Sequence, residues 1–229
     1  YRMPYHTILF DLDNTILDFN RGEDAAIHQT LLHLGLPATD EVKKRYSEIN
    51  LSLWKLLEQK KITRSRLLVK RFELLFEELN VQEDGQKAWH FYESQLSQAA
   101  YFMDGAKELL EQLKGKKRMF IVSNGTASVQ HGRIKKAELA PYFEQIFISE
   151  EVGVNKPDPA FFTYCFSHIP DFEQDKTIIV GDSLSSDIAG GIAAGLATCW
   201  FHAEPAVLPD HITPDYEITS LQDLSPILN

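Results

Sequence analysis

Four carboxylates occur in two short segments that lie far apart in the chain. Asp11 and Asp13 belong to the segment Asp-Leu-Asp-Asn-Thr, and Asp182 and Asp187 belong to Gly-Asp-Ser-Leu-Ser-Ser-Asp. Carboxylates that share one crevice repel one another unless a hard cation lies among them, and Mg²⁺ prefers oxygen ligands of this kind. If the fold brings the two segments together, these acids are candidate ligands of a divalent cation.

Three further polar residues could complete such a site. Ser123 and Asn124 follow an apolar segment, and Lys156 lies in Val-Asn-Lys-Pro-Asp. A lysine beside carboxylates cancels charge and a hydroxyl donates a hydrogen bond, so together they suit a phosphoryl group. Each segment taken alone could be an ordinary turn or a solvated loop, but all of them together favour one shared site.

The candidate residues follow short apolar segments that are typical of buried strands. We expect strands at residues 7–10, 119–122, 145–148, 177–180 and 197–201. We expect the intervening helices near residues 104–115, 126–137, 159–167 and 188–194. Alternating strands and helices of this kind predict an α/β fold with a parallel sheet covered on both faces, in which ligands bind beyond the carboxyl ends of the strands.

A different pattern separates the first expected strand from the others. Four amphipathic helices are expected, near 22–34, after Thr39, after Thr63 and near 83–98, and they indicate a small bundle. We therefore predict two domains: an α/β core of residues 1–17 and 101–229, and an inserted helical domain of residues 18–100.

Taken in chain order, the polar segments resemble the four motifs of the haloacid dehalogenase-like (HAD) superfamily. The matching residues are Asp11, Asp13 and Thr15, then Ser123, then Lys156, then Gly181, Asp182 and Asp187. The resemblance covers nearly the whole chain. It implies a Rossmann-like core with a helical cap inserted after the first motif, and Mg²⁺-dependent hydrolysis of a phosphomonoester.

The resemblance also implies a role for each residue of the first motif. Asp11 would be the nucleophile that forms an aspartyl-phosphate, and Asp13 would be the general acid and then the base. Thr15 would orient the loop. A carboxylate at Asp13 argues against a dehalogenase, because HAD members of that kind lack this second acid.

The remaining implied roles concern the phosphate and the metal. Ser123 and Lys156 would hold the phosphoryl oxygens with help from the backbone of Asn124. The expected ligands of Mg²⁺ are the Asp11 carboxylate, the Asp13 backbone carbonyl, Asp182 and Asp187.

A finer resemblance points to the bacterial pyrimidine 5′-nucleotidases, which are nucleoside monophosphate phosphatases. It rests on residues 149–157 and 186–200, and in the cap on Asn50, Leu53, Trp54, Ile62, Arg71 and Phe72. Asn50 and Trp54 are four residues apart and share a helix face, where an aromatic ring could stack on a base and an amide could read its edge. Alternatively, Trp54 belongs to the core of the bundle and Arg71 pairs with a neighbouring glutamate.

The same chemistry would also serve a phosphoglycolate-type or sugar-phosphate phosphatase or a phosphomutase. A non-catalytic binding module could keep the fold without turnover. Release of phosphate from an aryl phosphate, dependent on Mg²⁺, would exclude the binding module, and isomerised substrate would identify a mutase.

The composition restricts the partners. The chain has 229 residues, of which 44% are hydrophobic and 24% charged, with a net charge of −10. The acidic balance disfavours nucleic acid as a partner, and no apolar run approaches the ~20 residues that span a bilayer. Cys165 and Cys199 form no C-x-x-C pair and fit a reducing compartment, so we expect a cytoplasmic protein whose partner is a small phosphorylated metabolite. The sequence leaves open whether it is a monomer or a homodimer.

Overall fold

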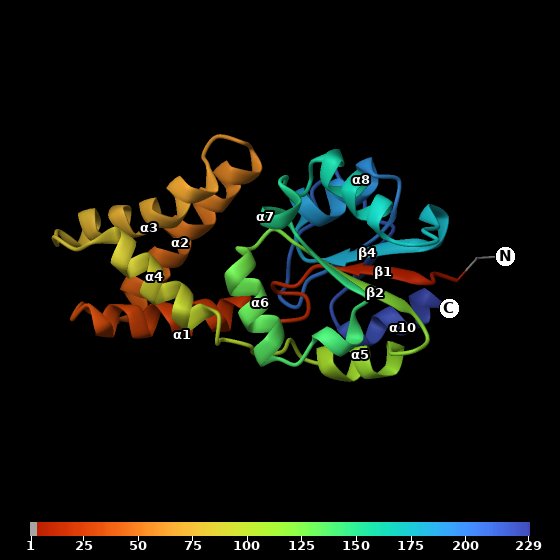
Figure 1. Cartoon of the computed structure of the whole chain (residues 1–229), viewed down its shortest axis with the longest axis horizontal. Coiled ribbons are helices and arrows are strands. Elements are labelled where there is room, and N and C mark those ends of the chain that lie inside the picture. Colours follow the sequence, from red (N-terminus) through yellow and green to blue (C-terminus); the bar gives the residue numbers. More distant parts are fainter. Residues whose placement is uncertain (1–3) are drawn as a thin grey trace.

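The computed structural model describes residues 4–229 and contains a six-stranded parallel sheet (Figure 1). The strand order is β3-β2-β1-β4-β5-β6. The strands are β1 (Thr7–Phe10), β2 (Arg118–Ser123), β3 (Gln145–Ile148), β4 (Thr177–Gly181), β5 (Ala197–Phe201) and β6 (Tyr216–Ile218). The predicted α/β fold with a parallel sheet is therefore confirmed. The edge strand β6 was not expected, because it is only three residues long and only its last residue is buried.

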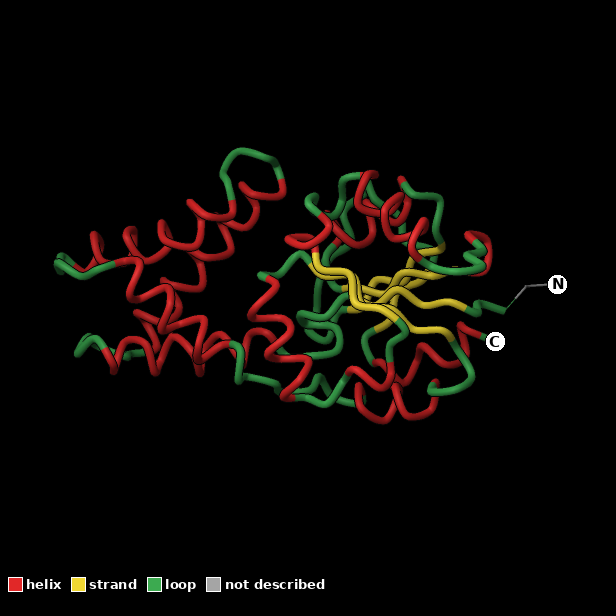
Figure 2. The backbone as a smooth tube through the Cα atoms, viewed as in Figure 1, coloured by secondary structure: helices red, strands yellow, loops and turns green. Residues whose placement is uncertain are grey.

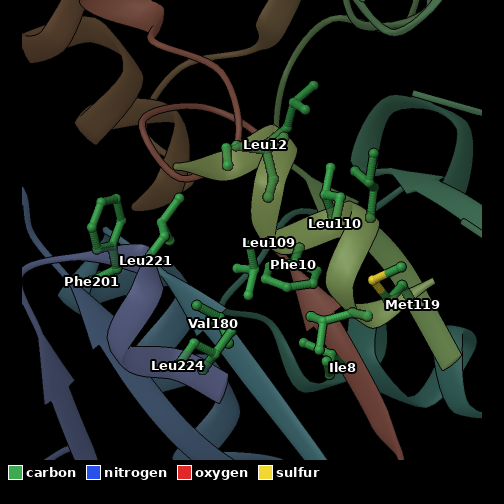
Figure 3. Close-up of a cluster of buried hydrophobic side chains, with 14 of the residues drawn as sticks. Ile8, Phe10, Leu12, Leu109, Leu110, Met119, Val180, Phe201, Leu221 and Leu224 are labelled. Atoms are coloured by element: carbon green, nitrogen blue, oxygen red, sulfur yellow. The ribbon is translucent and has the colours of Figure 1, made fainter. Parts of the chain in front are cut away.

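Helices cover both faces of the sheet because the central strands are apolar on both sides. Ile8 and Phe10 pack on one face with α5 (Ala106–Leu113) and α10 (Leu224–Leu228), as Figure 3 shows. Leu9 points to the other face, where it packs with the buried side chains of α8 (Pro159–His168). This alternation buries β1 and β4 completely and leaves the carboxyl ends of the strands as the open edge of the sheet.

The other helices of the α/β part are α6 (Ala127–Lys136), α7 (Ser149–Val152) and α9 (Ala189–Ala193). Helix α9 lies close to the sheet because Gly191 has no side chain: a Cβ atom there would lie 2.5 Å from the Ile179 side chain. A π-helical segment, Leu184–Ile188, precedes α9, so helical structure begins four residues before the helix expected near residues 188–194. This segment carries Asp187 into the site described below.

The inserted helices are α1 (Phe19–His33), α2 (Asp40–Glu58), α3 (Arg64–Leu79) and α4 (Gly85–Leu96), and we call these four helices the cap (Figure 2). The side chains of Thr39 and Thr63 accept hydrogen bonds at the starts of α2 and α3, as the sequence predicted. Helix α1 begins three residues earlier than expected, because Asp18 caps it. The cap has its own hydrophobic cluster, with Tyr46, Phe72 and Tyr92 at its centre. Among the described residues, no helix has the length and hydropathy needed to cross a membrane.

Candidate active site

The carboxyl ends of three neighbouring strands form the floor of the site. Strand β1 lies between β2 and β4, so Asp11, which follows β1, lies beside both Ser123 at the end of β2 and Asp182 after β4. The Asp11 N–H donates to the carbonyl of Val180 in β4, which continues the strand pairing up to this residue. The parallel topology therefore places segments distant in sequence at one edge.

Three carboxylates converge at this edge. Oxygen atoms of Asp11, Asp182 and Asp187 all lie within 4.8 Å of one another. Gly181 makes the approach of Asp187 possible, because a Cβ atom at position 181 would lie 2.2 Å from Asp187 Oδ2. The same carboxylate oxygen accepts a hydrogen bond of 3.2 Å from the backbone N–H of Ser183.

Lys156 neutralises part of this charge. Its side chain is 1% exposed, and Nζ donates to Asp11 Oδ1 at 3.0 Å, Asp187 Oδ1 at 2.6 Å and the Val122 carbonyl at 2.7 Å. Asn124 holds the backbone of Lys156 in place, because its side-chain amide donates to the Lys156 carbonyl and accepts from the Lys156 N–H at 2.9 and 2.8 Å. The Asn124 side chain therefore positions the lysine, and its amide faces the loop.

The electrostatics of the buried acids suit a divalent cation. Burial raises the pKa of Asp11 to about 8; Lys156 opposes this shift and Asp182 adds to it. Burial and the neighbouring carboxylates also raise the pKa values of Asp182 and Asp187. Burial alone would lower the pKa of Lys156, but Asp11 and Asp187 outweigh it and raise this pKa. One ammonium group does not balance three clustered carboxylates, of which Asp11 and Asp187 are buried and Asp182 is half-buried, and their hard oxygen donors are those that Mg²⁺ prefers.

Two residues that the sequence did not single out hold Asp13. Arg133 Nη1 donates to Asp13 Oδ1, and Gln130 Nε2 donates to Asp13 Oδ2 at 3.1 Å and to Ser123 Oγ at 2.8 Å. Arg133 Nε also donates to the carbonyl of Ala99 at 3.1 Å, just after the last cap helix. Both side chains are fully buried on α6. Their spacing of three residues just after the Ser123 segment is the signal that could have pointed to them.

Thr15 is buried beneath the first motif, but its hydroxyl makes no hydrogen bond within residues 4–229. The loop is shaped instead by the Leu12 carbonyl, which accepts from Ile16 and Leu17 at 3.0 Å each. Asn14 adds a left-handed residue with φ of 56°, and its side chain accepts from the Phe19 N–H at 2.9 Å. The contacts that order this loop therefore come from the backbone and Asn14.

The cap and the α/β part together line a cavity of about 260 Å³ beside the carboxylates. Asn50, Trp54 and Arg71 all line it, together with Asp11, Asp13, Asn124, Lys156 and Asp182 from below. The structure thus brings the predicted cap residues and most of the predicted core residues to one space. Its size suits a small ligand, since drug-sized ligands occupy pockets of about 300–1,000 Å³.

Arg64, a residue of the cap, forms hydrogen bonds with the α/β part. The sequence analysis did not identify this residue. Arg64 Nη2 lies 3.1 Å from the Asn124 carbonyl, 3.0 Å from Ser149 Oγ and 3.1 Å from Asn155 Oδ1. Its guanidinium also lies 5.4 Å from the centre of the Trp54 ring. The first residue of α3 therefore connects the Ser123 and Lys156 loops with the cap side of the cavity.

Comparison with known proteins gives a consistent result over the length of the chain. The family described as haloacid dehalogenase-like hydrolase matches residues 8–201. The HAD-hydrolase YfnB of Bacillus subtilis is 38% identical over 98% of this chain and 96% of its own length. The crystal structure of YfnB bound to magnesium, which shows interdomain movement, has a TM-score of 0.94 over 99% of this chain and 100% of that chain.

The names of two other relatives state the class of substrate on which they act. The pyrimidine 5′-nucleotidase PynA of Streptococcus pneumoniae is 38% identical over 99% of this chain and 96% of its own length. The pyrimidine 5′-nucleotidase YjjG of Escherichia coli is 33% identical over 99% of both chains.

Proposed function

This chain belongs to the haloacid dehalogenase-like hydrolase family, and we propose that it hydrolyses pyrimidine nucleoside 5′-monophosphates with the aid of Mg²⁺. The observation that carries the proposal is the position of Lys156 Nζ, which bridges Asp11 and Asp187 at the floor of the cavity. An ammonium group beside a carboxylate nucleophile and a cation site is an arrangement suited to a phosphoryl group.

In the proposed reaction, an Asp11 carboxylate oxygen attacks phosphorus, and the bond from phosphorus to the ester oxygen breaks. Asp13 donates a proton to the departing nucleoside oxygen. In the second step Asp13 takes a proton from water as the water oxygen attacks the aspartyl-phosphate, which releases phosphate and restores Asp11. Both Asp13 oxygens accept a hydrogen bond from α6 in this structure, and each keeps a second lone pair that can carry the transferred proton.

The other residues of the site bind and neutralise the phosphoryl group. Lys156 would offset the charge of its oxygens, and Ser123 Oγ and the backbone of Asn124 would donate to them. Asp11, Asp182, Asp187 and the Asp13 carbonyl would hold Mg²⁺, which when bound supplies further positive charge to the phosphoryl oxygens.

The substrate class is supported by the two pyrimidine nucleotidases among the relatives and by the character of the cavity. Its walls include the aromatic rings of Phe19 and Trp54, with Asn50 and Arg71 at the cap end. A base placed against Trp54 would put its polar edge toward the charged side chains of the cap. We extend the proposal to a cytoplasmic setting, which the free buried thiols of Cys165 and Cys199 support.

A phosphate-release screen tests this function. The purified protein with Mg²⁺ is expected to hydrolyse p-nitrophenyl phosphate, and excess EDTA should stop the reaction because the buried carboxylates then lack their cation. Among natural esters, kcat/KM should be highest for uridine, thymidine or cytidine 5′-monophosphate. Higher values for purine nucleotides or sugar phosphates would contradict the substrate class, and no release from any ester would contradict the chemistry.

Trp54→Ala is expected to lower kcat/KM for pyrimidine nucleotides by about tenfold or more, since stacking of a base on an aromatic ring contributes about 1–3 kcal/mol. Turnover of p-nitrophenyl phosphate should change much less. Trp89→Ala serves as a control, because Trp89 packs in the cap without lining the cavity. An equal loss on both substrates would show that Trp54 acts only in cap packing.

A further inference from the structure

Four charged or amide side chains of the cavity lining, one from each helix of the cap, lie next to one another. These are Glu23 from α1, Asn50 from α2, Arg71 from α3 and Glu93 from α4. Glu23, Asn50 and Arg71 are buried, with exposed fractions of 5% or less. Burial of so many polar groups is costly unless each has a partner, so their hydrogen bonds can be counted.

The amide of Asn50 is fully oriented by residues of the cap. Its Oδ1 accepts from Trp54 Nε1 at 2.9 Å and from Arg71 Nη1 at 3.2 Å, while its Nδ2 donates to Glu23 Oε2 at 2.8 Å. Indole and guanidinium groups only donate, so the amide oxygen must face them. Both lone pairs of that oxygen are used, so the oxygen of Asn50 holds Trp54 and Arg71 in place. The predicted contact of Asn50 with a base would fall to the second N–H of Nδ2, since the first donates to Glu23.

The guanidinium group of Arg71 is held by hydrogen bonds at two of its three nitrogen atoms. Its Nε donates to the Leu68 carbonyl at 3.0 Å, and its guanidinium lies 4.8 Å from the centre of the Tyr92 ring. Its Nη2 makes no hydrogen bond within residues 4–229; the nearest carboxylate oxygen, Glu93 Oε1, is 3.9 Å away. That distance is too long for a hydrogen bond, so Nη2 keeps donors to offer.

Glu93 is the matching acceptor. Its Oε1 is buried and has no hydrogen-bond partner in the described part of the chain. Other buried atoms there also lack partners, but among the residues that carry them only Glu93 lines the cavity. A buried carboxylate oxygen without a donor is unfavourable, and a ligand N–H would remove that cost.

We propose that Glu93 and Arg71 together recognise the base of the substrate, with Glu93 Oε1 accepting an N–H and Arg71 Nη2 donating to the neighbouring acceptor of the ring. This inference rests on the proposed function, whose site it deepens. The edge of uracil or thymine presents N3–H beside a carbonyl, and the edge of cytosine presents its amino group beside N3. One acceptor and one donor 3.9 Å apart can therefore serve all three pyrimidines.

The pair selects bases that present an N–H beside an acceptor and leaves the identity of the base open within that class. Purines can also present such an edge, so this pair by itself does not exclude them. Glu23 and Asn50 are positioning residues in this scheme, because they act on the substrate through Arg71 and Trp54.

The test compares Glu93→Ala and Glu93→Gln with the unchanged protein on uridine 5′-monophosphate, cytidine 5′-monophosphate and p-nitrophenyl phosphate. For Glu93→Ala we expect kcat/KM to fall at least about tenfold on both nucleotides, mainly through KM, and to stay within about twofold on the aryl phosphate. Glu93→Gln keeps an acceptor oxygen and should recover part of the loss on uridine 5′-monophosphate. Glu77→Ala, which alters an exposed glutamate of α3, is the matched control and should leave kcat/KM unchanged on all three substrates.

Three results would overturn the proposal. If Glu93→Ala slows the aryl phosphate as much as the nucleotides, Glu93 only balances the charge of Arg71 in the cap. If Glu93→Ala leaves kcat/KM unchanged on the nucleotides and on the aryl phosphate, Glu93 does not contact the substrate. If the unchanged protein hydrolyses the aryl phosphate but no pyrimidine nucleotide, the proposed substrate class fails before any variant is compared.

Discussion

Asp11→Asn is expected to lower kcat by about four orders of magnitude or more, which is the scale of loss when a covalent nucleophile is removed. An amide does not attack phosphorus, yet it has the shape of the carboxylate, and its oxygen can still accept from Lys156 Nζ. The substitution also removes one charge from three crowded carboxylates, so the free energy of unfolding should stay the same or rise. Phosphate release and urea unfolding measure the two effects.

The control for Asp11→Asn is Asp210→Asn, which alters an exposed carboxylate outside the cavity. It should leave turnover and stability unchanged. Turnover by Asp11→Asn close to that of this control would refute the nucleophile assignment. Loss of turnover together with a large drop in stability would mean that Asp11 serves the fold, which the crowding of its neighbours argues against.

Lys156→Met is expected to impair both catalysis and folding. Without the ammonium group, Asp11 and Asp187 remain buried with no cation beside them, and breaking a buried pair of this kind costs about 3–5 kcal/mol. We expect that loss in the free energy of unfolding measured in EDTA, and a fall in kcat of about 10²–10³ from lost stabilisation of the phosphoryl oxygens.

Added Mg²⁺ should restore part of the stability of Lys156→Met, because a cation held by the same carboxylates compensates their charge. Lys176→Met removes a surface ion pair between a half-buried lysine and the exposed Glu173, and it should change stability by less than about 1 kcal/mol. If Lys156→Met is as stable as Lys176→Met in EDTA, the lysine does not balance the buried acids.

Most of the fold could be predicted from local patterns in the sequence. Short apolar runs such as Thr7–Phe10 are buried strands, because a parallel sheet covered on both faces needs strands that are apolar on both sides. Thr39 and Thr63 cap their helices because a side-chain oxygen can satisfy free N–H groups within the next turn. The π-helical segment Leu184–Ile188 could not be predicted, since it depends on seating Asp187 against Gly181.

The sequence by itself determined which residues could do the chemistry. The acids and the lysine were identified because their motifs occur in order at the ends of strands, and parallel strands bring such ends to one edge.

Only the tertiary structure decided which contacts hold those residues and which polar groups of the cap can contact a ligand. The contacts of Arg133 with Asp13, of Arg64 with the Ser123 loop, and of Arg71 with Asn50 join different helices and loops. Such contacts have no periodicity or fixed spacing in the chain. They follow from the packing of separate elements, which also leaves Glu93 Oε1 without a hydrogen-bond donor among residues 4–229 and uses both lone pairs of the Asn50 amide oxygen.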